Sequence, residues 1–240
     1  MRIIKCKNYD EVSAQAARIV AGQIAVKPDS VIGFATGSTP IGTYKLLIEK
    51  YEKGELDFSE ITAFNLDEYY PISRGNEQSY YYFMRENLFS KININPDNCH
   101  IPNGEAKTPE ANCKAYDALI KEKGGIDMQI LGIGQNGHIG FNEPDENLVG
   151  GTHMTDLTEN TIEANSRFFE NKSDVPTKAL TMGMAEILKA RKIILLANGK
   201  NKHDAVKALL DDFITTKNPS TFLKVHNDVV LICDEEALNG

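Results

Sequence analysis

The sequence predicts an α/β fold: a Rossmann-like, mainly parallel sheet flanked by helices, arranged as a three-layer sandwich. Short apolar segments of strand length alternate with segments of helical periodicity, which is the pattern of βαβ units. In addition, 41% of the 240 residues are hydrophobic, enough for a large core. Because no linker, repeat or low-complexity segment interrupts this order, we expect residues 1–240 to form a single domain.

The expected strands and helices follow one another regularly. Apolar segments predict strands at residues 31–36, 61–67, 126–134, 192–199 and 228–234. Helical spacing is found at residues 40–54, 77–89, 109–125 and 200–212. Ligands of parallel sheets bind beyond the carboxyl ends of the strands. We therefore expect the loops that follow the strands to carry the chemistry.

The composition excludes several classes of protein. A net charge of −8 without a run of Lys or Arg disfavours nucleic acid as a partner, because phosphate backbones require a basic face. No apolar segment approaches about 20 residues, so we expect no membrane association, and the N-terminus lacks the apolar core of a secretory signal. The four cysteines are scattered, which predicts reduced thiols in a cytoplasmic protein without a metal site.

A glycine-rich loop follows the apolar residues 126–130. Its G-x-G-x-x-G pattern at Gly132, Gly134 and Gly137 is typical of dinucleotide-binding loops, and Asp156 lies roughly 20 residues further on, as a ribose ligand would. Such a loop should open a helix, but the sequence continues HIGFNEP, whose glycine and proline predict irregular structure. We therefore disfavour a dinucleotide and expect no cofactor.

The same loop presents Asn136, His138 and Glu143. Its glycines allow the backbone to turn sharply and to approach a ligand closely. An imidazole with a pKa of about 6.5 beside a carboxylate suits proton transfer near neutral pH. The alternative is that His138 belongs to the core and that Glu143 faces solvent.

The turn after the strand predicted at residues 31–36 is a second candidate for a ligand-binding site. Thr36, Gly37, Ser38 and Thr39 precede Pro40, and Thr39 as N-cap before a proline predicts an ordinary helix start. The free N–H groups, the hydroxyls and the positive dipole end of such a start also suit an anion. The lysine of a nucleoside-triphosphate loop is missing, which favours a monophosphate.

Two further kinds of charged group follow predicted strands or lie near them. Asp67 ends the apolar segment 61–67, and an aspartate with an ordinary pKa is ionised at pH 7 and available as a base. Lys202 lies at a strand-to-helix junction, where a cation opposes the helix dipole unless it faces an anion. Arg167 can complete a bidentate phosphate clamp. The simpler explanations are an acidic turn for Asp67 and solvated surface charges for the two cations.

Together these groups predict acid–base chemistry on a small phosphorylated molecule. An aldose–ketose conversion of a sugar phosphate needs one group that moves a proton at the ring oxygen and another that carries a proton between C2 and C1. His138 suits the first task and Asp67 the second. The sequence shows neither metal-ligand spacing nor a G-x-S-x-G elbow that would indicate another chemistry.

Several motifs in a fixed order resemble the glucosamine-6-phosphate deaminase family. They are FATGSTPIGTYKLL, FNLDEYY, SYYYFMRENLF, LGIGQNGHIGFNEP, ANSRFF and CDE. The resemblance runs from the first strand to the last few residues and implies a Rossmann-like sandwich shared with phosphogluconolactonases and ribose-5-phosphate isomerases. It also implies conversion of D-glucosamine 6-phosphate and water to D-fructose 6-phosphate and ammonia, in amino-sugar catabolism.

The resemblance implies a role for each catalytic candidate. Asp67 would be the base of the enolisation step, and His138 would accept and donate the proton of ring opening, supported by Glu143. Many members have Asp where this chain has Asn136. Because an amide does not exchange a proton in this way, we expect Asn136 to orient His138 or the sugar.

The resemblance also implies a phosphate site and a lid. The phosphate would lie on residues 36–39 with Arg167 and Lys202, and a mobile lid would correspond to residues 150–169. Regulated members bind N-acetylglucosamine 6-phosphate through a serine and an Arg-x-Lys, where this chain has Glu146 and the His-Met-Thr of residues 153–155. The chain also ends soon after its last strand. We therefore expect a monomer or small homo-oligomer with hyperbolic kinetics and no activator.

Two alternatives to the deaminase remain open. A lactonase of the same fold, acting on 6-phosphogluconolactone, would need no base at C2, so that loss of Asp67 would barely affect it. A sugar-phosphate sensor would carry an appended DNA-binding segment, whereas this chain begins its first strand at once.

Overall fold

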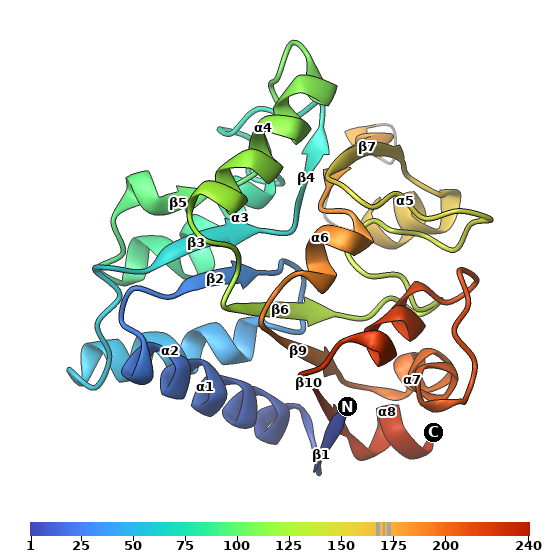
Figure 1. Ribbon diagram of the computed structural model, residues 1–240, viewed down its shortest axis with the longest axis horizontal. Helices are drawn as coiled ribbons and strands as arrows, with labels where there is room; N and C mark the ends of the chain where they lie inside the picture. Colours follow the sequence, from blue (N-terminus) through green and yellow to red (C-terminus); the bar gives the residue numbers. More distant parts are fainter. Residues whose placement is uncertain (167–168, 170, 172–173) are drawn as a thin grey trace.

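A seven-stranded parallel sheet runs through the molecule in the order β1-β10-β9-β6-β2-β3-β5. The computed structural model in Figure 1 describes residues 1–166, 169, 171 and 174–240. The strands of the large sheet are β1 (Arg2–Cys6), β2 (Val31–Phe34), β3 (Thr62–Asn65), β5 (Cys99–His100), β6 (Met128–Gly132), β9 (Lys192–Ala197) and β10 (Val229–Asp234). The prediction of a mainly parallel α/β sheet is confirmed.

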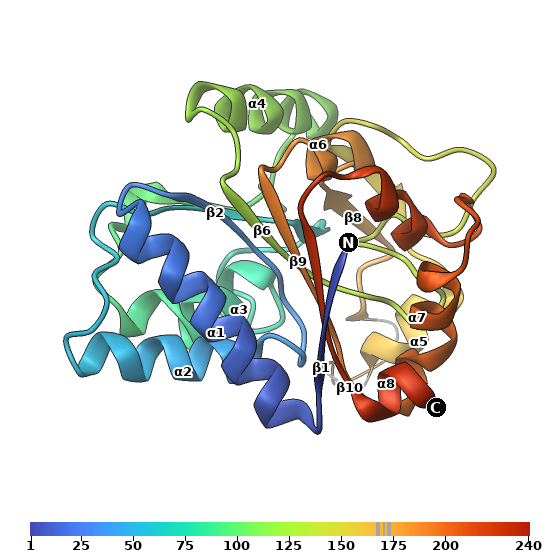
Figure 2. The ribbon, with the colours of Figure 1, turned by 60° about the horizontal axis from the view of Figure 1, so that its bottom comes forward.

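Helices cover both faces of this sheet and make three layers (Figure 2). One face is covered by α1 (Tyr9–Val26), α2 (Ile41–Glu52) and α3 (Tyr80–Asn87). The other face is covered by α4 (Pro109–Glu122), α6 (Met184–Leu188), α7 (His203–Leu210) and α8 (Glu235–Asn239). Successive side chains of a strand point to opposite faces, so Ile130 of β6 packs in the first core and Leu131 in the second.

A second, smaller sheet was not expected from the sequence. It is antiparallel, in the order β4-β8-β7, and consists of β4 (Asp67–Tyr70), β7 (His153–Asp156) and β8 (Lys178–Thr181). The short helix α5 (Glu159–Ser166) follows β7 and lies beside this sheet in Figure 1. The small sheet lies beyond the carboxyl ends of the strands of the large sheet. It brings residues of the expected lid, 150–169, toward those ends.

The order of the strands determines where a site can form. From β2 the chain continues to β3 on one side, whereas β6 pairs with β2 on the other side. The strand order reverses between β2 and β6, which is the switch point at which parallel sheets bind their ligands. Because all strands of this sheet are parallel, the loops after β2, β3, β6 and β9 lie at one edge.

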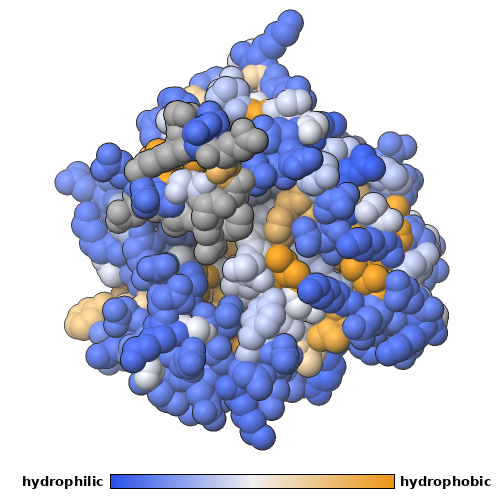
Figure 3. Space-filling view, turned by 180° about the vertical axis from the view of Figure 1, so that it is seen from behind, coloured by the Kyte–Doolittle hydropathy of each residue, from blue (hydrophilic) through white to orange (hydrophobic). Residues whose placement is uncertain are grey.

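The outer surface is mainly polar. Seen from behind, it is mostly hydrophilic, and hydrophobic side chains gather in small patches near the middle of that face (Figure 3). None of the helices in the described ranges has the length and apolar character needed to cross a membrane. The four cysteines are free thiols, three of them buried.

Candidate active site

Asp67 lies where the chain leaves the large sheet. The N–H of Leu66 donates to the carbonyl of Phe34 at 3.1 Å, and the N–H of Met182 donates to the carbonyl of Leu66 at 2.8 Å. Leu66 is thus shared between the two sheets, and Asp67 begins β4 opposite Thr181. The prediction of one strand through residues 61–67 is wrong at its end, although Asp67 does lie just beyond the carboxyl end of β3.

The carboxyl group of Asp67 is buried without an ion pair among the described residues. The residue is 5% exposed, and burial, with the neighbouring negative charge of Glu68, raises the pKa of Asp67 to about 8. The expectation that Asp67 is ionised at pH 7 is therefore wrong for the protein without a ligand, because an unpaired carboxylate is costly to desolvate. A cation brought in by a ligand would favour the ionised form.

Glu68, the next residue, has a structural role. Its carboxylate accepts the backbone N–H groups of Tyr69 at 2.9 Å, Tyr80 at 2.8 Å and Tyr81 at 2.9 Å. Two of these belong to the first turn of α3, whose N–H groups have no partner within the helix. Burial raises the pKa of Glu68 to about 7 against these hydrogen bonds. The two adjacent acids therefore differ: Glu68 caps a helix, and Asp67 does not.

The loop after β6 is built around its histidine. It closes on itself, since the N–H of Gly134 donates to the carbonyl of His138 at 2.9 Å and the N–H of Gly137 donates to that of Gly134 at 3.0 Å. Gly137 has a φ of +83°, which favours glycine, and a Cβ on Gly134 would overlap the imidazole of His138. The chain opens no helix until α5, at Glu159, so the prediction of irregular structure is confirmed. Gly134 makes room for the imidazole, and Gly137 lets the chain turn against the side chain of Asn218.

Two hydrogen-bond donors and the imidazole of His138 surround the carboxylate of Glu143. Its Oε1 lies 3.2 Å from Nδ1 of His138 and accepts the hydroxyl of Thr161, from α5, at 2.6 Å. Its Oε2 accepts Nδ2 of Asn136 at 2.7 Å. Although burial raises the pKa of Glu143, these hydrogen bonds and the nearby imidazole hold that pKa at about 2.

An ionised Glu143 determines which imidazole nitrogen can react. A carboxylate with so low a pKa only accepts hydrogen bonds, so Nδ1 of His138, 3.2 Å from Oε1, is the nitrogen that suits a proton on this side of the ring. Nε2 is then the atom that can exchange a proton with a ligand. Asn136 also accepts the backbone N–H of His138 at 3.2 Å through Oδ1, and its amide therefore orients both Glu143 and the loop.

Asp67 and this loop meet at one edge. A Cβ placed on Gly140 would lie 3.4 Å from Oδ2 of Asp67 and 2.9 Å from Oγ1 of Thr181. The hydroxyl of Thr181 also accepts the N–H of Phe141 at 3.1 Å. Because Thr181 pairs with Asp67 across the small sheet, it holds the loop beside the buried carboxyl group.

Tyr80, at the first position of α3, connects this edge with the turn after β2. Its ring stacks on that of Phe141 with centroids 6.1 Å apart and lies 4.7 Å from that of Tyr69, and Thr36 is near enough to influence the pKa of its phenol. Burial raises the pKa of Tyr80 well above its usual range, so the phenol stays neutral. The sequence did not single out this tyrosine within its SYYYF motif.

The turn formed by residues 36–39 is open to a ligand. Gly37 and Ser38 are exposed, and within the described part of the chain no hydrogen bond uses the N–H groups of residues 37–39. The expectation that Thr39 caps α2 is wrong: Pro40 is the N-cap, without a side-chain cap, and α2 begins at Ile41. The hydroxyl of Thr39 instead donates to Oδ1 of Asn198 at 3.1 Å.

Asn198 brings the predicted cation loop to the same place. It follows β9 directly, and in this loop the N–H of Lys202 donates to the carbonyl of Gly199 at 3.0 Å. Lys202 is half-buried at the start of α7. The hydrogen bond between Thr39 and Asn198 therefore joins the two loops that were predicted to share a phosphate. Arg167, the other predicted cation, lies outside the described residues.

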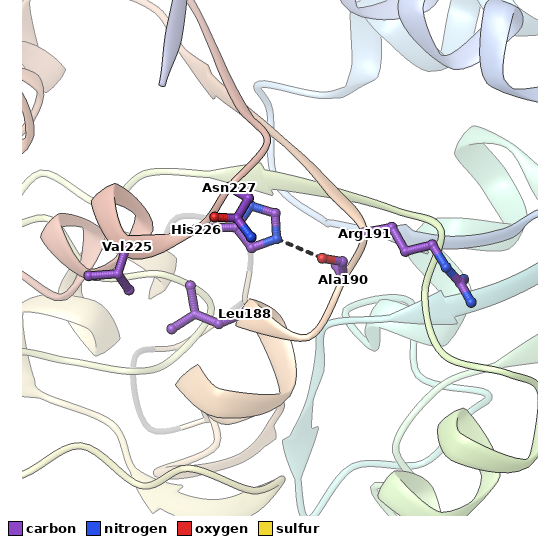
Figure 4. Close-up of a pocket in the computed structure, with 6 residues that line it drawn as sticks. All are labelled: Leu188, Ala190, Arg191, Val225, His226 and Asn227. Atoms are coloured by element: carbon purple, nitrogen blue, oxygen red, sulfur yellow. Dashed lines mark hydrogen bonds between the residues drawn. The ribbon is translucent and has the colours of Figure 1, made fainter.

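A cavity of about 370 Å³ lies away from these groups, at the amino edge of the sheet. It is lined by Leu188, Ala190, Arg191, Val225, His226 and Asn227. The Nε2 of His226 donates to the carbonyl of Ala190 at 2.6 Å (Figure 4). Its Nδ1 accepts the N–H of Asp228 at 3.1 Å. Both nitrogens of this imidazole are engaged in structure, so the cavity offers no second acid–base pair.

Comparisons with known proteins identify the family. The family described as glucosamine-6-phosphate isomerases/6-phosphogluconolactonase matches residues 7–232. The chain belongs to this family. It is 56% identical over 237 residues to the glucosamine-6-phosphate deaminase of Halothermothrix orenii, covering 99% of this chain and 98% of that protein. It is 55% identical, with the same coverage, to the deaminase of Clostridium perfringens.

Solved structures of the family show the same fold. A monomeric glucosamine-6-phosphate deaminase, described as a missing link of the NagB superfamily, aligns with a TM-score of 0.96 at 45% identity, covering 99% of this chain and 98% of that one. The 6-phosphogluconolactonase of Thermotoga maritima aligns with a TM-score of 0.76 at 21% identity, covering 98% and 99%. The predicted family is confirmed.

Proposed function

We propose that this protein is a glucosamine-6-phosphate deaminase, which converts D-glucosamine 6-phosphate and water to D-fructose 6-phosphate and ammonia. The observation that carries the proposal is that the buried side chain of Asp67 lies beside the loop that holds His138 and Glu143. Relatives at 52% to 56% identity that match 99% of the chain bear the name of this activity. The surroundings of each of these side chains support a distinct role in the reaction.

The phosphate end of the substrate is placed on the turn after β2. Thr36, Gly37, Ser38 and Thr39 offer N–H groups and hydroxyls, which suit the oxygens of a phosphate monoester. Lys202 supplies positive charge from the adjoining loop, and Arg167 is proposed as the second cation. This local charge is needed because the protein as a whole has a net charge of −8.

Ring opening is assigned to His138. Its Nε2 takes the proton of the anomeric hydroxyl and delivers a proton to the ring oxygen, while Glu143 stabilises the imidazolium that forms between the two transfers. Asn136 keeps Glu143 in place through the hydrogen bond of 2.7 Å. The product of this step is the open-chain amino aldehyde.

Isomerisation is assigned to Asp67. The 2-amino group of the substrate is a cation, and its approach lowers the pKa of the carboxyl group, which lies at about 8 without a ligand. The substrate therefore helps to generate its own base. Asp67 removes the proton from C2 and returns it to C1, while the aldehyde oxygen gains the proton that the ammonium group gives up, which leaves a hydroxyl group on C1 and an iminium group at C2. Water then adds to C2 and ammonia departs, which gives the ketose.

The nearest alternative is hydrolysis of a phosphogluconolactone, since lactonases share the fold. That reaction needs no proton transfer between C2 and C1. A lactonase would gain nothing from a buried carboxyl group with a raised pKa beside the loop that carries His138 (residues 133–143, the histidine loop). Asp67 is thus the residue that separates the two functions.

The proposal is tested by measuring ammonia release from glucosamine 6-phosphate and hydrolysis of 6-phosphogluconolactone with the same preparations. Wild-type protein is expected to release ammonia and to exchange the C2 proton with solvent deuterium, and Asp67→Asn to lose both. His138→Gln should slow turnover of the closed ring far more than that of an open-chain analogue. Lactone hydrolysis that survives Asp67→Asn, without ammonia release by the wild type, would assign the lactonase function instead.

The assembly and location of the enzyme are part of the same proposal. We propose that residues 1–240 act as one domain, as a monomer or small homo-oligomer in the cytoplasm, without an activator. A relative at 45% identity is monomeric, and the activator positions of regulated members correspond here to Glu146 and residues 153–155. A sigmoidal rate curve that N-acetylglucosamine 6-phosphate makes hyperbolic would contradict the absence of activation.

A further inference from the structure

One of the two hydrogen-bond donors to Glu143 comes from outside its own loop. Thr161 lies in the first turn of α5, 18 residues further along the chain, and its hydroxyl is 2.6 Å from Oε1 of Glu143. The same Oε1 lies 3.2 Å from Nδ1 of His138. Thr161 is 9% exposed, so water does not readily replace its hydroxyl. The contact therefore belongs to the packed interior of the site.

The direction of each hydrogen bond around Thr161 is determined. Glu143 is ionised and only accepts, so the hydroxyl of Thr161 must donate to it. The oxygen of Thr161 is then free to accept, and the hydroxyl of Thr158 lies 3.0 Å from it as donor. Thr158 in turn accepts the N–H of Thr161 at 3.2 Å, as an N-cap residue does. The start of α5 thus directs the hydroxyl proton of Thr161 toward the carboxylate of Glu143.

Packing holds α5 in the position that makes this contact. Leu157 and Ile162, on either side of Thr161, pack in a cluster with Tyr69 and Phe141. Phe141 belongs to the histidine loop, so α5 and the loop share an apolar contact as well as the hydrogen bond. The N–H of Leu157 is also anchored, donating to the carbonyl of Thr177 at 2.8 Å.

We propose that Thr161 is a positioning residue for ring opening: it fixes Oε1 of Glu143 so that Nδ1 of His138 keeps its proton and Nε2 faces the sugar. This inference rests on the proposed function. The terminal torsion of a glutamate is broad, and without the hydroxyl of Thr161 the carboxylate can rotate about it. His138 then loses the partner that selects its tautomer and ring orientation.

The kinetic test compares Thr161→Val, Thr161→Ser and Thr177→Val. The valine removes the hydroxyl while keeping the shape, the serine keeps the hydroxyl, and Thr177→Val makes the same change at an exposed position of the neighbouring segment. We expect Thr161→Val to lower kcat on the closed-ring substrate roughly tenfold, with KM little changed. Thr161→Ser should stay within about threefold of wild type, and Thr177→Val should not differ.

An NMR test does not depend on catalysis. The ¹⁵N shifts of the His138 side chain, assigned by comparison with His138→Gln, should show protonated Nδ1 and unprotonated Nε2 in wild type at pH 8. In Thr161→Val the two shifts should approach each other, and in Thr161→Ser they should not. Unchanged shifts and unchanged kcat in Thr161→Val would overturn the inference, as would a serine variant as slow as the valine variant. Wild-type protein that releases no ammonia would refute the proposed function, while the shifts would still decide the role of Thr161.

Discussion

Asp67 and Asp127 are both buried, each 5% exposed, but they lie at opposite edges of the large sheet. Asp127 immediately precedes β6 at the amino edge. Its Oδ2 is 2.6 Å from Nζ of Lys27 and accepts the N–H of Val31 at 2.8 Å, and its Oδ1 is 2.6 Å from Nη1 of Arg191. Asp67, at the carboxyl edge, has no ion pair within the described ranges. The two residues expose equally little surface, but Asp67 lies deeper in the protein and, among the described residues, has no cationic partner.

The pKa values of the two carboxyl groups move in opposite directions. Burial raises both, but around Asp127 the two cations and the N–H of Val31 outweigh it and lower the pKa below its ordinary value. Around Asp67 nothing offsets burial, and the pKa rises to about 8. The comparison teaches that depth and partners together separate a structural carboxylate from a reactive one.

The largest expected effect is on catalysis. Asp67→Asn keeps the shape of the side chain but cannot carry a proton between C2 and C1, so ammonia release should fall roughly a thousandfold or more. The same change at Asp127 should leave kcat per folded molecule unchanged. Steady-state ammonia assays on both variants decide the point. Comparable losses in the two variants would remove the functional difference between the edges.

The next effect is on stability. Asp127→Asn leaves Lys27 and Arg191 without their carboxylate, and we expect a loss of about 2–4 kcal/mol in the free energy of unfolding. Asp29, which is exposed, provides the control, because Asp29→Asn should stay within about 0.5 kcal/mol of wild type. Urea unfolding at pH 7 gives the free energy of unfolding of wild type, Asp127→Asn and Asp29→Asn. A stable Asp127→Asn would show that its ion pairs contribute little.

The pH dependence of stability should differ in sign between the two sites. The folded-state pKa of Asp67 is raised, so its contribution is present at low pH and lost as pH rises through about 8. Asp67→Asn should therefore gain stability relative to wild type with rising pH, by roughly 1–3 kcal/mol between pH 5 and pH 9. For Asp127, whose pKa is lowered, the destabilisation by Asn should be full at neutral pH and shrink below about pH 4. Unfolding curves across this range test both signs.

The pH dependence of kcat/KM should also reveal the raised pKa of Asp67. Because the base must be ionised in the free enzyme, kcat/KM should rise about tenfold for each pH unit below about 8 until another group limits it. The corresponding limb of kcat should lie at lower pH, since the bound ammonium group stabilises the carboxylate. A kcat/KM that is flat between pH 6 and pH 9 would contradict the raised pKa of Asp67.

The smallest expected effect concerns the phosphate turn. Thr39→Val removes the hydrogen bond of 3.1 Å to Asn198 and loosens the connection between the two phosphate-binding loops. We expect KM to rise about threefold with kcat nearly unchanged, because the loss of one part-buried neutral hydrogen bond has about this effect. An effect on kcat alone would place Thr39 with the reacting atoms instead of the phosphate.

The sequence by itself determined the α/β class, most of the strands of the large sheet, and the loops that carry the site. These features depend on local periodicity and on glycine and proline positions, which short segments express regardless of their neighbours. The order of the motifs also indicates the family, and the residue types at strand ends single out Asp67, His138 and Glu143. Their convergence follows from parallel strands, whose carboxyl ends share an edge.

Only the tertiary structure decided what each group can do. Leu66 divides the segment 61–67 between two sheets because its partners, Phe34 and Met182, lie far away in sequence. Glu68 caps a helix while Asp67 is left protonated, and Thr161 reaches Glu143 from another helix. Burial keeps Asp67 protonated, and hydrogen bonds from distant segments hold Glu68 and Glu143. A sequence pattern, in contrast, reports only on residues that are neighbours along the chain.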